Sequence, residues 1–403
     1  RSAPSVNAGT MLASMLLAAV AAVPAAEVSL KGSRMDIFVP SARYPCFRQP
    51  AIAAAGADGK TLLAFAENRN VSACAPAMER AALTPKVGHP NEVGSLQLRR
   101  STDGGESWSP MQSLYVGNID FYVVAVAAGG SEVTLLLQSS TDSGTVTLRS
   151  TDAGVTWTNA GLFSVTTPPD ITGLKPTVGH GVTVKSGLCS AVGGCAHTGR
   201  IVVPMVGSNS SAGHGGGDKA QCPACVSFLI YSDDAGKTWT FGGLGPPQSR
   251  EAEIVQLPST TADSIFYMNA RNMGPTPGHR MAATCTGGGT ACGDYRVDMA
   301  LTSPVTAHWR GIVASVLGIP TASGRVTVAY AGPGSTTARA NMTIRTSSDN
   351  GESWSPPTTV WPGLAAYSDL ALVGTEGDSV AMIFENGEAT FADRVSVQLL
   401  TVA

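Results

Sequence analysis

Short apolar runs recur along the whole chain, and turn residues separate one run from the next. The runs are rich in Val, Ile, Leu and Thr, and they are too short and too closely spaced for long helices. Periodicity typical of long helices is nearly absent. This pattern predicts an all-β protein built from many short strands.

An eight-residue box with the pattern S-x-D-x-G-x-x-W punctuates these runs. We expect its Ser and Asp side chains to bond nearby backbone amides in a tight turn, and its Gly to adopt a positive φ. The Trp then fills the gap beside the hairpin. The box therefore predicts a structural hairpin rather than a catalytic site. It occurs four times, at Ser101–Trp108, Ser150–Trp157, Ser232–Trp239 and Ser347–Trp354.

The spacing of the boxes predicts a repeat architecture. Successive boxes start 49, 82 and 115 residues apart, which suits blades of roughly 45 to 60 residues, some with a box and some without. Five or six such blades fill residues 27–403. We predict a single six-bladed β-propeller domain over that range.

An apolar stretch precedes this domain. Met11–Ala26 is too short to cross a bilayer comfortably and ends in small residues, as the core of a signal peptide does. We expect residues 1–26 to be a signal peptide cleaved near Ala25 or Ala26. A buried strand or helix at the start of the fold is the alternative, because Arg1 is the only upstream positive charge. No later segment resembles a membrane span, so stable membrane insertion is not expected.

The chain has eight cysteines, and an even number agrees with the oxidising compartment that a signal peptide implies. We therefore expect a secreted or lumenal protein, in the lysosome or elsewhere in the endomembrane system. A zinc site at Cys222 and Cys225 is the competing interpretation, although neither a second such pair nor a His pair lies near it. The expected disulfides are Cys189–Cys195, Cys222–Cys225, Cys285–Cys292 and Cys46–Cys74.

The charge balance limits the partners. The formal net charge is -3 and charged residues make up 14% of the chain, so there is no basic field and nucleic acid is not an expected partner. A local cluster would have to hold an anionic ligand. We expect no cofactor and no catalytic metal, and the sequence leaves the oligomeric state open.

Several segments, taken with the four boxes, resemble the sialidase (neuraminidase) superfamily. The resemblance covers the chain from about Met35 to the C-terminus, and its motifs follow in the family's order. One position departs from the family's arginine motif F/Y-R-I-P, because Gln49 follows Arg48. The matching segments are Tyr44–Pro50, Leu62–Arg69, Glu251–Leu257, Asn269–Arg271, Arg339–Thr343, Ala366–Leu370 and Ile383–Glu385.

This resemblance implies an exo-α-sialidase, a glycoside hydrolase that removes terminal sialic acids with retention of configuration. Its partners would be sialylated glycans of glycoproteins, gangliosides and oligosaccharides. Tyr367 would be the nucleophile and Glu251 its base. The substrate-binding residues would be Arg48, Arg271 and Arg339, with Arg69 beside them and Glu385 steadying Arg48.

The chemistry explains these residue types. Three guanidinium groups give a carboxylate fixed, always charged, bidentate donors that Lys does not reproduce. A neutral phenol can approach the anomeric carbon beside that carboxylate without the repulsion that a second carboxylate would meet. Sialidases with a Tyr nucleophile are a recognised exception to two-carboxylate glycosidase chemistry.

The general acid departs from the family pattern. The family has an Asp on a loop before the first box, whereas no Asp occurs between Arg69 and Ser101. The matching position is Pro90. Glu92 is the first candidate for the acid and Glu79 the second, since a longer carboxylic acid side chain can do the same proton transfer.

Other functions share these residues. A hydrolase of a related 2-keto-3-deoxy sugar acid or a trans-sialidase would use the same clamp and nucleophile. A non-catalytic sialoglycan-binding propeller would keep the arginines and lose the acid, and a protein-interaction scaffold would need neither.

Overall fold

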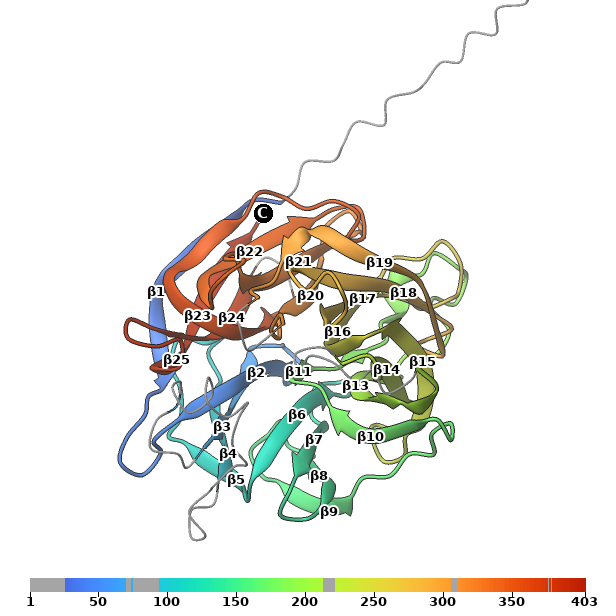
Figure 1. The fold of residues 1–403 in the computed structure, drawn as a ribbon. Helices are drawn as coiled ribbons and strands as arrows, with labels where there is room; N and C mark the ends of the chain where they lie inside the picture. The colour runs from blue at the N-terminus through green and yellow to red at the C-terminus, as the bar shows by residue number, and fades with distance from the viewer. Residues whose placement is uncertain are drawn as a thin grey trace, which may run out of the picture.

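The computed structural model describes residues 26–69, 74, 94–212, 222–305, 310–375, 377 and 379–403. Strands dominate this part of the chain, and its helices are two short 3-10 turns, Ser186–Leu188 and Ser210–Ala212. Figure 1 shows the strands grouped into sheets that form a ring. The prediction of an all-β, propeller-like protein is confirmed.

The described strands form five sheets. The first holds β2 (Phe47–Ala55), β3 (Thr61–Asn68), β4 (Ser95–Ser101) and β5 (Gln112–Val116). The second holds β6 (Ile119–Val126), β7 (Val133–Ser139), β8 (Gly144–Ser150) and β9 (Thr158–Leu162), with β11 (Gly179–His180) beside β6. The third holds β10 (Ile171–Pro176), β13 (Ile201–Asn209), β14 (Cys225–Ser232) and β15 (Thr240–Pro247), with β12 (Val182–Thr183) beside β13.

The last two sheets differ in size. One holds the four strands β16 (Ser249–Leu257), β17 (Ile265–Asn272), β18 (His279–Thr286) and β19 (Ala291–Thr302). The other has seven strands, which are β20 (Ser315–Pro320), β21 (Val326–Pro333), β22 (Ala340–Ser347), β23 (Thr358–Val373), β24 (Ser379–Gly387), β25 (Arg394–Val402) and β1 (Val28–Phe38).

The number of sheets differs from the predicted six separate blades because of β23. This strand is 16 residues long. It pairs with β22 through residues 358–364 and with β24 through residues 364–373, with a register shift between Ala365 and Ser368. One strand thus joins two groups of strands into a single hydrogen-bonded sheet, which the spacing of the boxes does not reveal.

The two ends of the described chain meet in this large sheet. β1 pairs antiparallel with β25, and the backbone N–H of Ala403 donates to the carbonyl of Glu27 at 2.9 Å. Figure 1 shows blue β1 running beside the red C-terminal strands. The N-terminal strand therefore completes the ring against the last strands. The expected signal peptide lies outside the described residues except for its last residue, Ala26.

The apolar core lies between neighbouring sheets. β3 is buried along nearly its whole length because side chains on both of its faces pack against other sheets, whereas the outer strand β9 is exposed throughout. Leu63 and Phe65 of β3 share one buried cluster with Leu135 and Leu137 of β7. Burying each such side chain stabilises the fold by about 1.5–3 kcal/mol.

The four boxes form the turns that their residues predict. In the first box, the Ser101 hydroxyl donates to Asp103 at 2.7 Å and accepts from the N–H of Gly105 at 2.8 Å, and Asp103 accepts from the N–H of Ser107 at 3.0 Å. The second, third and fourth boxes repeat this network. Trp157 packs edge-on against Phe65 of the neighbouring sheet, with 6.1 Å between ring centroids.

The fourth position of the box also has a positive φ, which the pattern did not predict. The φ is 54° at Ala153, 58° at Ala235 and 63° at Asn350, as against 75° at Gly104. Non-glycine residues seldom adopt this conformation. The side-chain hydrogen bonds of the Ser and Asp therefore hold the turn against a backbone preference.

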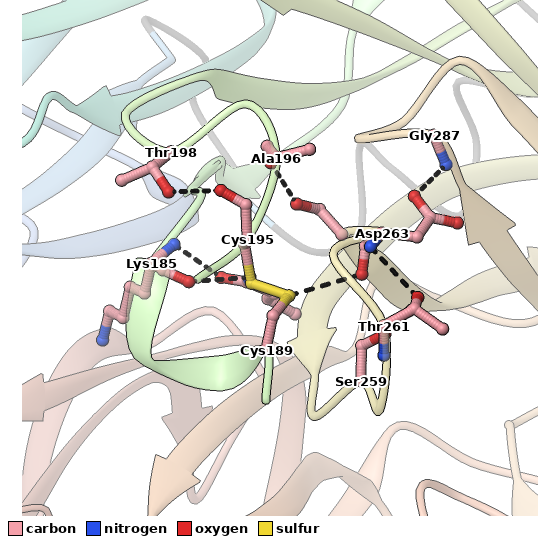
Figure 2. Close-up of a disulfide and its surroundings, with 11 residues drawn as sticks. Lys185, Cys189, Cys195, Ala196, Thr198, Ser259, Thr261, Asp263 and Gly287 are labelled. Carbon is pink, nitrogen blue, oxygen red and sulfur yellow. Dashed lines mark hydrogen bonds between the residues drawn. A yellow bond between two sulfur atoms is a disulfide. The ribbon is translucent and has the colours of Figure 1, made fainter. Parts of the chain in front are cut away.

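All four expected disulfides are present, and none of the eight cysteines is free. The zinc interpretation of Cys222 and Cys225 is wrong, because these two form a disulfide with each other. Figure 2 shows the Cys189–Cys195 loop lying against the segment that carries Thr261 and Asp263. The disulfides agree with the expected extracellular or lumenal environment. Neither described helix approaches the length that a membrane crossing needs.

Candidate active site

The strands nearest the axis of the ring, among them β2, β16 and the second half of β23, bring several predicted site residues together. Arg48 lies near the start of β2, Glu251 near the start of β16, and Tyr367 where β23 turns from β22 to β24. Strand pairing brings Arg271 to the same place, because it lies on β17 opposite Arg250, which directly precedes Glu251 on β16. Residues from distant parts of the sequence therefore meet in one cluster.

Arg48 and Glu385 form a fully buried ion pair. The two side chains are 0% exposed, and the Arg48 guanidinium donates to the two Glu385 oxygens at 2.5 and 3.0 Å. Glu385 also accepts from the backbone N–H groups of Gln49 at 2.7 Å and Tyr367 at 3.1 Å. One carboxylate therefore fixes Arg48 and the backbone of Tyr367 relative to each other.

Arg271 and Glu251 form a second buried pair, with 2.6 Å between Nη1 and Oε2. The Nε of Arg271 donates to the carbonyl of Arg310 at 2.7 Å. Burial lowers the pKa of Arg271, but Glu251 and Tyr367 outweigh this effect and raise it above its ordinary value. Burial raises the pKa of Glu251, but Arg271 and Arg250 outweigh this and lower it. Glu251 is therefore a carboxylate at neutral pH.

Arg339 lies just before β22 and approaches the same tyrosine. Its guanidinium carbon is 5.7 Å from the centroid of the Tyr367 ring, and that of Arg48 is 5.4 Å from it. Burial lowers the pKa of Arg339 to about 10. Arg271 also interacts with Tyr367, so three arginines lie around one phenol.

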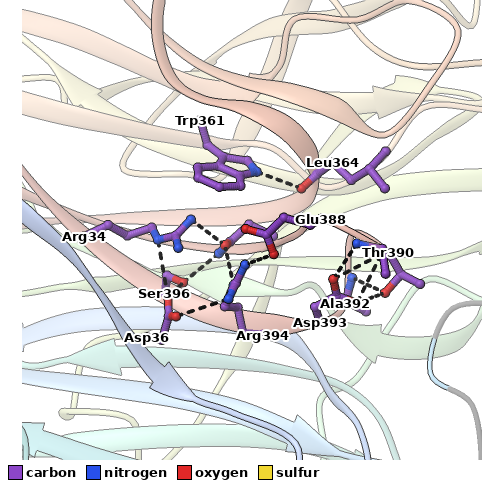
Figure 3. Close-up of polar contacts among 12 residues, drawn as sticks. Arg34, Asp36, Trp361, Leu364, Glu388, Thr390, Ala392, Asp393, Arg394 and Ser396 are labelled. Atoms are coloured by element: carbon purple, nitrogen blue, oxygen red, sulfur yellow. Dashed lines mark hydrogen bonds and ion pairs between the residues drawn. The ribbon is translucent and has the colours of Figure 1, made fainter.

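Phe391 covers two of these arginines. Its ring centroid is 5.0 Å from the guanidinium carbon of Arg48 and 4.8 Å from that of Arg339, close enough for cation–π attraction. It belongs to the loop between β24 and β25, which Figure 3 shows closed by Asp393 and Thr390. The Asp393 carboxylate accepts from the Thr390 hydroxyl at 2.6 Å.

The remaining predicted residues divide into those that are described and those that are not. Arg69 pairs with Glu67 at 2.7 Å, and although burial lowers its pKa, Glu67 raises it above the ordinary value. Glu92 and Glu79 lie outside the described residues. The Cys46–Cys74 disulfide places Cys74 against the apolar cluster that contains Tyr367.

A second layer of polar residues lies beneath this cluster on the same strands. Asp369 lies two residues after Tyr367 on β23, and Glu253 lies two residues after Glu251 on β16. Asp369 bonds to His180 Nδ1 at 2.7 Å and accepts from the N–H of Ile52 at 2.8 Å. No sequence motif indicates that His180, Glu253 and Asp369 lie together.

Glu253, His180 and Asp369 could hold a metal ion by geometry, since one ligand atom from each lies within 4.8 Å of the others. A simpler account fits these atoms. The His180 nitrogen is already hydrogen-bonded to Asp369, and burial together with Asp369 raises the pKa of Glu253 well above its ordinary value, so a proton can be shared among these groups without an ion. The expectation that the protein uses no metal stays a prediction.

A cavity of about 530 Å³ lies along the axis of the ring below this layer. Later residues of the inner strands line it, including Ile254, Leu317 and Leu370, and His180 reaches it from above. The arginines and Tyr367 are not among its lining residues. The candidate active site and the axial cavity therefore have different linings, and His180 of the polar layer reaches the cavity.

Sequence reasoning also missed Arg280, which is fully buried on β18. Its Nε donates to Asn269 at 2.8 Å and its Nη1 to the carbonyl of Ile312 at 2.6 Å. Ile312 belongs to the apolar cluster of Tyr367. Arg280 therefore supports the wall of the site. Arg280 is the second residue of β18, and the residues around it form no motif that would indicate a buried position.

Comparison with known proteins agrees with this geometry. Residues 119–379 match the family model described as a BNR repeat-like domain. The chain is similar to a sialidase of Micromonospora viridifaciens, with 24% identity over 415 aligned positions that cover 93% of this chain and 57% of that protein. The chain spans about half the length of the curated relatives it matches.

Solved structures show the same fold. The Hadza microbial sialidase Hz136 superimposes with a TM-score of 0.65 at 17% identity, covering 91% of this chain and 68% of the other. The intramolecular trans-sialidase from Ruminococcus gnavus gives a TM-score of 0.64 at 14% identity, covering 91% and 97%. The family model covers more than half of this chain, so the protein belongs to the BNR repeat-like domain family and, with its sialidase relatives, to the sialidase superfamily.

Proposed function

We propose that the protein is a retaining exo-α-sialidase that hydrolyses terminal sialic acids of glycoproteins, gangliosides and oligosaccharides. The observation that carries this proposal is the convergence of Arg48, Arg271 and Arg339 on the single phenol of Tyr367. A set of guanidinium groups around a nucleophile suits a sugar whose anomeric carbon bears a carboxylate.

The clamp acts before the chemistry. Arg48 and Arg271 are each held by a buried carboxylate, so their positions are set before the substrate arrives. Donors that are already oriented cost little reorganisation when charge develops in the transition state. The substrate carboxylate binds against these guanidinium groups and places the anomeric carbon beside Tyr367.

In the first step the Tyr367 oxygen forms a bond to the anomeric carbon while the bond to the glycosidic oxygen breaks. Glu251 accepts the phenol proton, and it is suited to this because Arg271 keeps it ionised. A carboxylic acid, for which Glu92 is the first candidate and Glu79 the second, donates a proton to the leaving oxygen.

In the second step water attacks the anomeric carbon and the bond to the Tyr367 oxygen breaks. The acid of the first step, now a carboxylate, takes a proton from the water. Glu251 returns the phenol proton to Tyr367. Two displacements at the same carbon retain its configuration.

We also infer how the chain is organised around this site. Dividing β23 at the register shift between Ala365 and Ser368 gives six groups of about four strands, as a six-bladed propeller requires. This domain begins near residue 27. Removal of residues 1–26 as a signal peptide would deliver it to a secretory compartment, where its four disulfides can form.

The test is turnover of a fluorogenic sialoside and of sialyl-lactose by wild type and by Tyr367→Phe. We expect Tyr367→Phe to lose at least about 10³-fold in kcat, since it removes the nucleophilic oxygen. Tyr295→Phe is the matched control, because Tyr295 is exposed on β19, outside the site. Equal activity of wild type and Tyr367→Phe would exclude this mechanism.

Two further readouts separate the finer alternatives. Glu92→Gln and Glu79→Gln should differ on sialyl-lactose, whose leaving group needs a proton, and agree on the fluorogenic substrate. Product analysis with added lactose as acceptor distinguishes hydrolysis from transfer. A deaminated analogue turned over faster than the sialoside would identify a related 2-keto sugar acid as the substrate.

A further inference from the structure

Arg250 is a half-buried cation at the edge of the site that forms no ion pair with a described carboxylate. It is the second residue of β16, directly before Glu251. Its guanidinium carbon lies 5.9 Å from the centroid of the Phe121 ring. Its Nε is buried and has no hydrogen-bond partner among the described residues.

Neighbouring cations show the contrast. Arg48 pairs with Glu385 and Arg271 with Glu251. At the rim, Lys175 lies 5.6 Å from the same Phe121 ring, but Asp120 pairs with it at 2.8 Å. A buried guanidinium donor without a partner is unfavourable. Arg250 therefore keeps an unpaired Nε donor beside Phe121, although its charge also acts on Glu251.

The position of Arg250 relates it to the proposed substrate. Phe121 belongs to the same apolar cluster as Tyr367. Arg250 contacts that ring, and its charge lowers the pKa of the adjacent Glu251 together with Arg271. A ligand that reacts at Tyr367 and extends across Phe121 therefore reaches the Arg250 guanidinium.

We propose that Arg250 binds a second anionic group, a carboxylate or a sulfate on the sugar next to the terminal acid sugar. The site then prefers doubly charged glycans over those with a neutral second sugar. Guanidinium suits either anion because its paired N–H groups bind two oxygens at once. This inference rests on the proposed function, since it assumes an acid sugar at Tyr367.

The test compares kcat/KM for three substrates. Sialyl-lactose has a neutral second sugar, α2,8-disialyl-lactose offers a carboxylate there, and 6-sulfated sialyl-lactosamine offers a sulfate. We expect wild type to prefer at least one of the doubly charged substrates by about 10-fold or more, which is the scale of one charge-assisted hydrogen bond. Arg250→Gln should reduce that preference to within about 2-fold, mainly through KM, and Arg250→Lys should be intermediate.

Arg325→Gln is the matched control, because Arg325 is exposed in the turn between β20 and β21 and its loss changes the net charge equally. The inference is overturned if wild type shows no preference, or if Arg250→Gln and Arg325→Gln retain the same preference. It is also overturned if Arg250→Gln slows all three substrates equally, since that result assigns Arg250 a general effect on Glu251.

A binding measurement separates this inference from the proposed function. Calorimetry with non-hydrolysable thio-linked analogues of the lactose substrates needs no turnover. Tighter binding of the disialyl analogue that depends on Arg250, without hydrolysis of any substrate, supports the second anion site and refutes the sialidase activity. If the protein hydrolyses the sialosides but Arg250 does not affect the binding of either doubly charged glycan, the sialidase activity is supported and the second anion site is refuted. Failure to bind either analogue refutes both.

Discussion

Replacing Glu385 by Gln removes one charge from the centre of the site while keeping the size and shape of the side chain. Glu385 and Arg48 are 0% exposed and make two hydrogen bonds of 2.5 and 3.0 Å. Removing one partner of such a pair leaves an uncompensated buried charge, which costs about 3–5 kcal/mol. Glu388, whose side chain is 68% exposed, pairs with Arg394 nearby. Its replacement by Gln should cost less than about 1 kcal/mol.

Urea unfolding followed by circular dichroism gives the free energy of unfolding of both variants, and thermal melts give their Tm. For a chain of this length, a loss of 3–5 kcal/mol lowers Tm by about 4–6 °C. Adding Arg48→Met to Glu385→Gln should recover part of the loss, because the unpaired charge is then gone. If Glu385→Gln and Glu388→Gln lose the same stability, burial does not set the energy of this pair and the reasoning fails.

Three further predictions concern pH and backbone strain. Hydroxyl hydrogen bonds within its box lower the pKa of Asp103 from 3.8 to about 2. The contribution of Asp103 to stability is therefore complete above about pH 4 and is lost as the pH falls toward 2. Across this range the urea midpoint of Asp103→Asn should fall less than that of wild type. Burial lowers the pKa of His180, but its carboxylate partner Asp369 raises it to about 9. The stability that this pair contributes is complete below about pH 6.5 and is lost as the pH rises through 9. In His180→Gln the urea midpoint should therefore change less between pH 6.5 and 9 than in wild type. Gly154→Ala places a Cβ 2.7 Å from Leu63, whereas Gly161→Ala meets nothing within 4 Å at a similarly positive φ; Gly154→Ala should therefore lower Tm more, and equal melting temperatures would contradict the crowding.

Local sequence determined the features that were predicted correctly. Each box is a closed network within eight residues, so its Ser, Asp and Gly specify the turn wherever the box occurs. Three of the four disulfides join cysteines three to seven residues apart, and the fourth pair follows by elimination. The order of the motifs also assigned Arg48, Arg271 and Tyr367 to one site, and the roles of these residues stay predictions.

Contacts between distant blades could not be predicted in this way. His180 and Asp369 are 189 residues apart and meet only because two inner strands lie side by side. Phe391 is one apolar residue in a loop, and nothing in its neighbours indicates that it covers two arginines. β23 joins two groups of strands because it pairs with both β22 and β24. The length and apolar character of a strand do not show which neighbours it pairs with.

The buried carboxylates connect the architecture of the ring to the geometry of the site. Glu385 accepts from the N–H of Gln49, Asp369 from Ile52 and Glu253 from Val316 at 2.9 Å, so each joins a strand of one group to a backbone amide of another part of the ring.

Loops alone would let the arginines move apart, because a loop has few such cross-links. Here the carboxylate that orients Arg48 also fixes the strand that carries Tyr367, since Glu385 bonds to both. Opening the clamp would break contacts between strands as well as an ion pair. The rigidity of the ring is therefore what keeps several like charges around Tyr367, and a change at Glu385 should alter stability and the binding of the proposed substrate together.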